Sequence, residues 1–277
     1  MALRTYYWND SVISKAPLAV LKLLSSKRAG NRFHTGNSGD IMAEKIIEYI
    51  YNVPAKVSKD EGRRLLCIGS IAHRILNGDV VCGIGAKSTN IPLARDINCH
   101  VYGLRGPITY DLFKKAGHLV DHVKFLADPG LLLKKMMPDL NIKPKPGKVI
   151  FIPHYKERFF YKKPINGYIE IMDIDIDPIK LGNKILEAEC ILSSSLHGII
   201  FSHALGRPCG FVLPQTDEPI IKYTDYFESV NVLDPKPLKN IYDYLPGSAI
   251  SLPSCIDEKI NSIQFPDISW LIKKGIV

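Results

Sequence analysis

The chain has 277 residues, 46% hydrophobic and 23% charged, and this composition excludes a disordered chain, a collagen-like repeat and a small disulfide-stapled scaffold. Its 36 Lys and Arg residues outnumber its 28 Asp and Glu residues, and the net charge of +8 favours anionic partners: phosphorylated substrates, nucleic acid or an acidic membrane surface. The six cysteines include no CxxC pair, so the sequence offers no zinc-ribbon or thioredoxin-type motif and fits reduced, buried thiols.

The N-terminal region contains one apolar stretch, APLAVLKLL at residues 16–24. Lys22 interrupts it and no basic region precedes it, so it does not have the pattern of a secretory signal peptide. The longest charge-free run, residues 190–206, contains four serines and two histidines and is too polar for a membrane span. We therefore expect a soluble, cytoplasmic protein.

Short runs rich in Val, Ile and Leu alternate with amphipathic stretches, a pattern typical of an α/β fold with parallel sheets. The predicted strands lie at residues 64–70, 79–85, 99–105, 124–128, 148–155, 167–175, 190–195 and 209–213. The predicted helices lie at residues 39–52, 107–117, 177–189 and 196–206. Between the two sets, residues 137–148 hold three prolines and a glycine and are predicted to form a linker.

This linker divides the chain into two Rossmann-like domains that would face each other across a cleft. We place an N-terminal α/β domain at residues 1–142 and a C-terminal α/β domain, with the main ligand site, at residues 143–255. Residues 256–277 would form a final helix or tail that packs back on the protein. In such folds the ligand binds at the carboxyl ends of the strands, in the cleft between domains.

The most informative stretch is CILSSSLHGIIFSHALGRPCGFVL, in which a buried strand ends at three serines and a helix begins at Leu196. The free N–H groups and the dipole of that helix start form a ready anion site. His197, in the first turn, would point toward the anion and could donate a hydrogen bond or a proton. The alternative is structural: the serines cap the helix and His197 fills a gap.

Two loops before predicted helices carry further candidates. In FHTGNSGD, the side chains of His34, Asn37 and Asp40 surround glycines, and Asp40 could accept a proton from a substrate hydroxyl; ordinary turn and helix-cap chemistry is the alternative. Arg105 follows a predicted strand and could grip phosphate or carboxylate with two parallel hydrogen bonds, unless it is a surface arginine.

Other polar residues fall near the predicted cleft. His154 and Tyr155 end the predicted strand at 148–155, and Lys222 follows what we expect to be a strand and turn. GIGAKS at residues 83–88 completes neither a dinucleotide-binding nor a Walker motif. Residues 134–163 hold nine Lys or Arg against two acids, which is either a solvated linker or a surface that attracts an anionic donor or anionic lipid headgroups.

In their order along the chain, these segments resemble the polysaccharide pyruvyl transferase family. The Ser-Leu-His-Gly block, with its apolar helix and Gly-x-Pro exit, is the most specific of them. The matching segments are GNSGD (36–40), IGSIAH (68–73), GIGAKS (83–88), LRGPIT (104–109), LADPGLLL (126–133), IPHY (152–155), SSSLHGIIFSHALGRPCGFV (193–212) and KYTDYF (222–227).

The resemblance implies a two-domain fold like that of GT-B glycosyltransferases. It implies transfer of a pyruvyl group from phosphoenolpyruvate onto two hydroxyls of a sugar, as a ketal, during assembly of exopolysaccharide, capsule or cell-wall glycan. No metal or other cofactor is required. The acceptor would be a saccharide, often lipid-linked, so the enzyme would be cytoplasmic with weak peripheral contact at the inner membrane face, and no nucleic acid would take part.

On this basis we expect His197 to act as an acid, a base or a phosphate contact, and Asp40 as an acceptor-side base. The expected donor-binding residues are Arg105, Ser194, Ser195, Leu196, Gly198 and Lys222. The expected acceptor or cleft residues are His34, Asn37, His154 and Tyr155.

Ser195 departs from the family pattern, because many relatives carry an arginine immediately before Leu-His. Another cation would then hold the donor phosphate, with Arg105, Lys87, Arg207 and Lys222 as candidates. Two other functions remain open from the sequence: a GT-B glycosyltransferase that uses a nucleotide sugar, and a carbohydrate- or nucleic-acid-binding protein without turnover.

Overall fold

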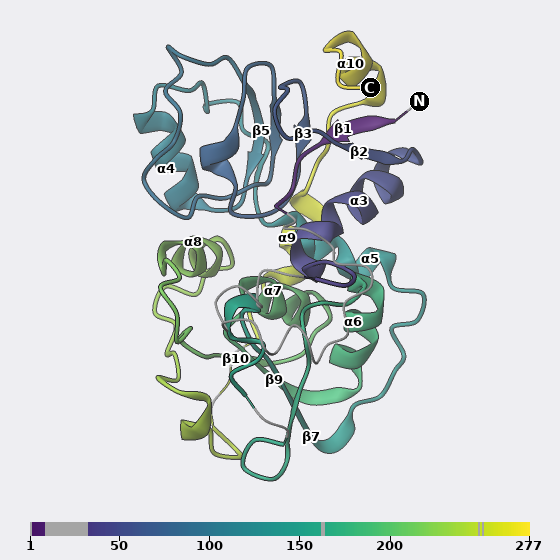
Figure 1. The fold of residues 1–277 in the computed structure, drawn as a ribbon, viewed down its shortest axis with the longest axis vertical. Coiled ribbons are helices and arrows are strands. Elements are labelled where there is room, and N and C mark those ends of the chain that lie inside the picture. Colours follow the sequence, from purple (N-terminus) through teal and green to yellow (C-terminus); the bar gives the residue numbers. More distant parts are fainter. Residues whose placement is uncertain (1, 9–32, 162–163, 249, 251) are drawn as a thin grey trace.

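The computed structural model describes residues 2–8, 33–161, 164–248, 250 and 252–277, so the apolar stretch at residues 16–24 lies outside the described residues. Across these ranges the strands form two parallel sheets, one of six strands and one of four. The protein is therefore an α/β protein whose two sheets are consistent with two Rossmann-like domains (Figure 1).

The first sheet has the strand order β2-β1-β3-β4-β5-β6. Its strands are β1 (Leu3–Thr5), β2 (Ala55–Val57), β3 (Leu65–Leu66), β4 (Val80–Cys82), β5 (His100–Leu104) and β6 (Phe125–Leu126). Helices α3 (Ser38–Tyr51) and α4 (Pro107–Lys115) and the 3-10 turn η1 (Ala72–Arg74) belong to this part. Helix α3 begins where the Asn37 side chain accepts a hydrogen bond from the Gly39 N–H, and it ends at Asn52 in the left-handed conformation.

The second sheet has the order β10-β9-β7-β8. Its strands are β7 (Lys145–Ile152), β8 (Ile169–Ile171), β9 (Ala188–Ser193) and β10 (Cys209–Phe211). The turn η3 (Tyr155–Glu157) and helices α6 (Pro178–Leu186), α7 (Leu196–Ala204) and α8 (Ile221–Ser229) follow these strands. Strand β7 takes in the last four residues of the predicted linker. The strand and turn expected before Lys222 are β10 and residues 212–220, but no helix was predicted for KYTDYF, which lies in α8.

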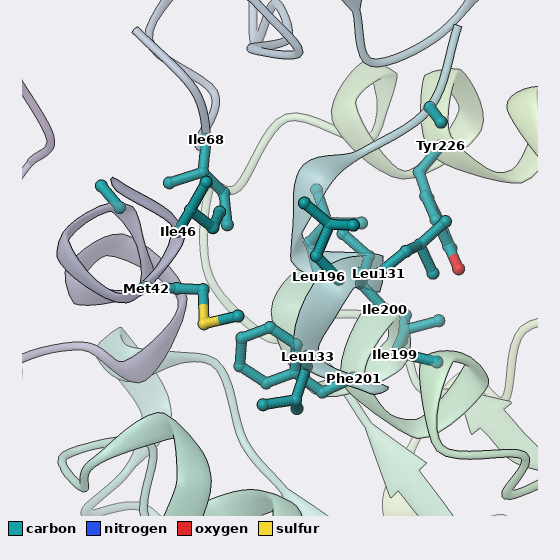
Figure 2. Close-up of a cluster of buried hydrophobic side chains, with 14 of the residues drawn as sticks. Met42, Ile46, Ile68, Leu131, Leu133, Leu196, Ile199, Ile200, Phe201 and Tyr226 are labelled. Carbon is teal, nitrogen blue, oxygen red and sulfur yellow. The ribbon is translucent and has the colours of Figure 1, made fainter. Parts of the chain in front are cut away.

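A continuous apolar core joins the two sheets. Figure 2 shows Met42 of α3 pointing toward Phe201 of α7 and Leu133, which begins α5 (Leu133–Met136), while Ile46 of α3 lies beside Ile68. The same buried cluster includes residues of η2 (Pro129–Leu132), α8 and α9 (Ile256–Ser262). After α9 the chain returns to the first sheet through α10 (Ile268–Lys273), where the Arg4 N–H donates to the Ile276 carbonyl at 2.9 Å.

A buried carboxylate of the second part fixes the loop before α3. Asp175, which follows β8, accepts hydrogen bonds from the backbone N–H groups of His34, Thr35 and Gly36 at 2.7 to 3.0 Å. Arg158 also donates to Asp175, at 2.8 Å. Because a hydrogen-bonded buried carboxylate is costly to leave unpaired, this Asp175 junction holds the start of α3 against the second sheet.

A second buried carboxylate joins α8 to the start of α4. Asp225 accepts hydrogen bonds from Arg105 Nε at 2.9 Å, from the Thr109 N–H at 2.8 Å and from Thr109 Oγ1 at 2.6 Å. Both charged side chains of this ion pair are fully buried. Gly106 permits the contact, because a Cβ there would overlap the Asp225 carbonyl oxygen. We call this the Asp225 junction.

We predict that Asp225→Ala lowers the free energy of unfolding by about 3–5 kcal/mol, because it leaves the Arg105 guanidinium buried without its anion. Urea unfolding followed by circular dichroism measures this. Asp234→Ala removes the partner of Lys236 in an ion pair whose side chains are 75% and 84% exposed, and should cost less than about 1 kcal/mol. Equal losses for the two variants would contradict the role of the junction.

Candidate active site

A cavity of about 140 Å³ lies between the two sheets. Its lining residues come from both parts of the chain, and most of them follow the carboxyl ends of β1, β3 and β4 of the first sheet and β7 and β9 of the second. They are Tyr6, Trp8, Asn37, Asp40, Ser70, Ile71, His73, Arg74, Lys87, His154, Tyr155, Ser195, Leu196, His197, Glu218 and Lys222. We call this space the central cavity.

The amino-terminal end of α7 opens into the central cavity. The first hydrogen bond within the helix runs from the Ile199 N–H to the Ser195 carbonyl, so the preceding N–H groups are left to other acceptors. The serines do not cap the helix as predicted: Ser195 makes no side-chain cap, and Ser193 Oγ instead accepts from the Ser195 N–H at 3.0 Å. The positive end of the helix dipole therefore faces the cavity.

His197 is held in place by α3. Its ring lies against Gly39, where any Cβ would overlap the imidazole. The ring is buried, and its Nε2 has no hydrogen-bond partner among the described residues. Burial and the positive charges of Lys222 and Arg105 lower the pKa of His197 to about 3, so its imidazole is neutral at pH 7. This neutral ring can donate or accept one hydrogen bond at the cavity.

Asp40 stands in the first turn of α3, half-buried in the cavity wall. Burial raises its pKa to about 7, although Lys222 and Lys87 pull it down. No hydrogen bond to its carboxyl group comes from the residues that the structure describes. A carboxyl group with this pKa exists in both protonation states near neutral pH, which suits proton transfer.

Lys222, Glu218 and His154 form a compact charged cluster. Lys222 Nζ donates to Glu218 Oε1 at 2.7 Å and lies 3.4 Å from His154 Nε2. Burial lowers the pKa of Lys222 to about 8, and burial together with the Lys222 charge holds the pKa of His154 well below its usual value. Lys222 is thus a buried cation, neutralised in part by one carboxylate. Glu218 was not predicted, because only the fold brings it to His154.

Two cations at the cavity, Lys87 and Arg74, are exposed and form no ion pair within the described ranges. Lys87 belongs to the GIGAKS segment after β4, and Arg74 ends η1. His73 beside them has an unpartnered buried Nδ1. Neither His73, the last residue of the IGSIAH segment, nor Arg74 was predicted as a site residue, although both come shortly after the carboxyl end of a strand, where ligands bind in such folds.

Several predicted residues lie outside the cavity lining. Arg105 is fully buried, and besides Asp225 its guanidinium donates to Ser70 Oγ and to the Ala86 carbonyl, each at 2.7 Å. Arg207 donates to the carbonyls of Leu186 and Ile142. Neither guanidinium lines the cavity, and both are held by other partners.

Three more predicted site residues do not line the cavity but help to position the segments around it. His34 contributes a backbone N–H to the Asp175 junction. Ser194 Oγ donates to Glu157 at 2.6 Å and accepts from the His154 N–H at 2.8 Å, which fixes the backbone of His154. Gly198 packs against Ser193, where a Cβ would overlap Ser193 Oγ.

The basic stretch at residues 134–163 is largely paired where the structure describes it. Lys134 pairs with Asp257, Lys145 and Lys148 with Glu187, Lys156 with Glu218, and Arg158 with Asp173 and Asp175. Among the described helices, none has the length and apolar character needed to cross a membrane.

Asp40 should destabilise the fold at alkaline pH. Its pKa rises from 3.8 to about 7 on folding, so the folded state binds this proton more tightly and loses stability as the pH rises through that interval. We predict that Asp40→Asn has a higher melting temperature than the wild type at pH 8 and a smaller difference at pH 4. Calorimetry at both pH values measures this, with the exposed Asp60→Asn as control. A lower melting temperature for Asp40→Asn at pH 8 would contradict the pKa shift.

One curated protein and one family model match this chain. The chain is 29% identical over 188 residues to the uncharacterized protein L143 of Acanthamoeba polyphaga mimivirus, a match that covers 64% of this chain and 63% of that protein. No solved structure gives a significant match. A family model for polysaccharide pyruvyl transferase matches residues 58–215, which include η1, Lys87, His154 and the start of α7. Since this match covers more than half of the sequence, the chain belongs to the polysaccharide pyruvyl transferase family.

Proposed function

We propose that the protein transfers a pyruvyl group from phosphoenolpyruvate to two hydroxyls of a saccharide, forming a ketal and releasing inorganic phosphate. The observation that carries this proposal is the central cavity, where a helix start and three cations surround one carboxyl group that can hold a proton at neutral pH. Family membership supports a pyruvyl donor and a polysaccharide acceptor.

The donor has two anionic groups, a phosphate and a carboxylate, and the cavity offers two places for them. The α7 start, with Lys222 beside it, suits the phosphate, because N–H groups and a buried cation attract the higher charge. Many relatives carry an arginine at the position of Ser195. In this chain Lys222 would supply the positive charge that such an arginine provides. Lys87 and Arg74, which follow strands of the first sheet, suit the carboxylate.

Ketal formation begins when a proton reaches the methylene carbon of the donor, which generates an oxocarbenium-like centre at its C2. We assign this proton to Asp40, because the neighbouring His197 is neutral at pH 7 and has no proton to spare as an acid. The first sugar hydroxyl adds to C2 and gives up its proton to the Asp40 carboxylate. The phosphate then leaves C2, and the second hydroxyl adds there as its proton passes to the departing phosphate.

His197 and Arg105 take supporting parts in this proposal. His197 would donate a hydrogen bond to the donor phosphate through its unpartnered Nε2. Arg105, whose donors are directed to Asp225, Ser70 and Ala86, would position the α4 start rather than clamp the donor. We propose that the acceptor contacts Tyr155 and Asn37, which line the cavity with His154, and that it is a lipid-linked saccharide met in the cytoplasm at the inner membrane face.

The direct test is incubation of the protein with phosphoenolpyruvate and a panel of saccharides, followed by mass spectrometry and a phosphate assay. Ketal product and phosphate in equal amounts, with no nucleotide present, would support the proposal. A glycosyltransferase of GT-B type, the alternative that a cationic cleft between two sheets also suits, would require a nucleotide sugar. Turnover with a nucleotide sugar and none with phosphoenolpyruvate would overturn the proposal.

The contact between His197 and Gly39 gives a paired prediction. His197→Ala should lower kcat by about 10²- to 10³-fold while the protein stays folded, because it removes a hydrogen-bond donor to the charge that develops on the departing phosphate. Gly39→Ala should also lower kcat, by at least about tenfold, because alanine fits the helical backbone of α3 but displaces the imidazole. The exposed His122→Ala is the control. Unchanged kcat in a folded His197→Ala variant would show that His197 has no role in the reaction.

The pH dependence of the reaction follows from Asp40 and Lys222. Because the protonated form of Asp40 is the acid and its pKa is about 7, kcat should fall as the pH rises above 7. The donor KM should rise above pH 8, where Lys222 loses its charge. Asp40→Asn should lower kcat at every pH and abolish its dependence near pH 7. An Asp40→Asn variant that keeps the wild-type profile would assign the proton to another group.

A further inference from the structure

One side of the central cavity is aromatic. Trp8 and Tyr155 both line the cavity, with ring centroids 4.9 Å apart and ring planes inclined at 40°. Phe33 lies behind them, with its centroid 6.1 Å from each. Trp8 and Tyr155 are only partly buried, whereas Phe33 is fully buried. We call Trp8 and Tyr155 the aromatic wall.

The aromatic wall is anchored to the Asp175 junction. The Arg158 guanidinium lies over the Phe33 ring at 5.2 Å, and Arg158 donates to both Asp173 and Asp175. Phe33 directly precedes the loop that Asp175 fixes. The residues that hold α3 against the second sheet thus also support the two rings, so the wall is positioned together with Asp40.

The aromatic wall is not suited to bind the donor. Phosphoenolpyruvate is small and carries negative charge at both ends, and the negative face of an aromatic ring does not attract such an anion. A pyranose differs in this respect: its C–H groups form an apolar face, and its hydroxyls point outward from the ring edge. Stacking of this face on an aromatic ring removes apolar surface from water and leaves the hydroxyls free to react.

Resting on the proposed function, we infer that Trp8 and Tyr155 form the acceptor subsite, on which a pyranose ring stacks with its two reacting hydroxyls toward Asp40. This assigns the substrate as a cyclic sugar with one open C–H face. An acyclic polyol with the same hydroxyls would lack that face and bind poorly.

Intrinsic fluorescence tests the binding directly, because the sequence has only two tryptophans, Trp8 and Trp270. Trp270 lies on α10, where it packs against His100 and outside the cavity lining, so Trp270→Phe leaves Trp8 as the sole reporter. The probes are the methyl glycosides of glucose, galactose and mannose, with mannitol as the acyclic control. A saturable change with at least one glycoside and none with mannitol supports the subsite; no change with any glycoside, or equal changes with mannitol, overturns it.

Kinetics separates this inference from the proposed function. With a glycoside that is turned over, Trp8→Ala should raise the acceptor KM by about tenfold, leave the donor Kd unchanged and be rescued by Trp8→Phe, which restores an aromatic face. Trp270→Ala is the matched control. Pyruvyl transfer with an unchanged acceptor KM in Trp8→Ala would overturn the subsite but not the function. Saturable glycoside binding without pyruvyl transfer would overturn the function but not the sugar-binding wall.

Discussion

Two buried carboxylates, Asp175 and Asp225, determine how the parts of this protein meet. Each accepts hydrogen bonds from the part of the chain that forms the other sheet. If the sheets separated, Asp225 would lose Arg105 and Asp175 would lose its three backbone donors. The apolar core that runs from α3 to α7 reinforces the same arrangement. The central cavity between these two junctions is therefore a preformed space, with His197, Asp40 and Lys222 placed before any ligand enters.

The chemistry of the cavity depends on what burial does to opposite charges. Burial moves the pKa of Asp40 up and that of Lys222 down, so both approach neutrality, and each charge partly offsets the change in the other. A carboxyl group and an amine with such pKa values lower the stability of the folded state, but they are well suited to hold and move a proton. The raised pKa of Asp40 has two consequences: it lowers the stability of the fold at alkaline pH, and it allows Asp40 to act as an acid near neutral pH.

Much of the fold could be predicted from the apolar runs, because parallel strands such as β4, β7 and β9 have buried segments (VVC, VIFI and CIL) that are continuously apolar. Helix α8 could not be predicted, because its buried face includes Lys222 and Asp225. Polar residues on a buried face interrupt the helical spacing of apolar residues. Strands β1 and β2 have three residues each, too short for a period to show. The partners of Arg105 and His197 are far away in the sequence, and only the fold shows that Asp225 and Gly39 meet them.

The proposed reaction depends most on binding of phosphoenolpyruvate in the central cavity through the α7 start and Lys222. Isothermal titration calorimetry of phosphoenolpyruvate tests this without any acceptor, on the wild type, on Lys222→Gln and on Arg207→Gln as a control cation outside the cavity lining. We predict one saturable site in the wild type, an affinity at least about tenfold weaker in Lys222→Gln and no comparable loss in Arg207→Gln. No binding by the wild type, or equal binding by Lys222→Gln, would contradict it.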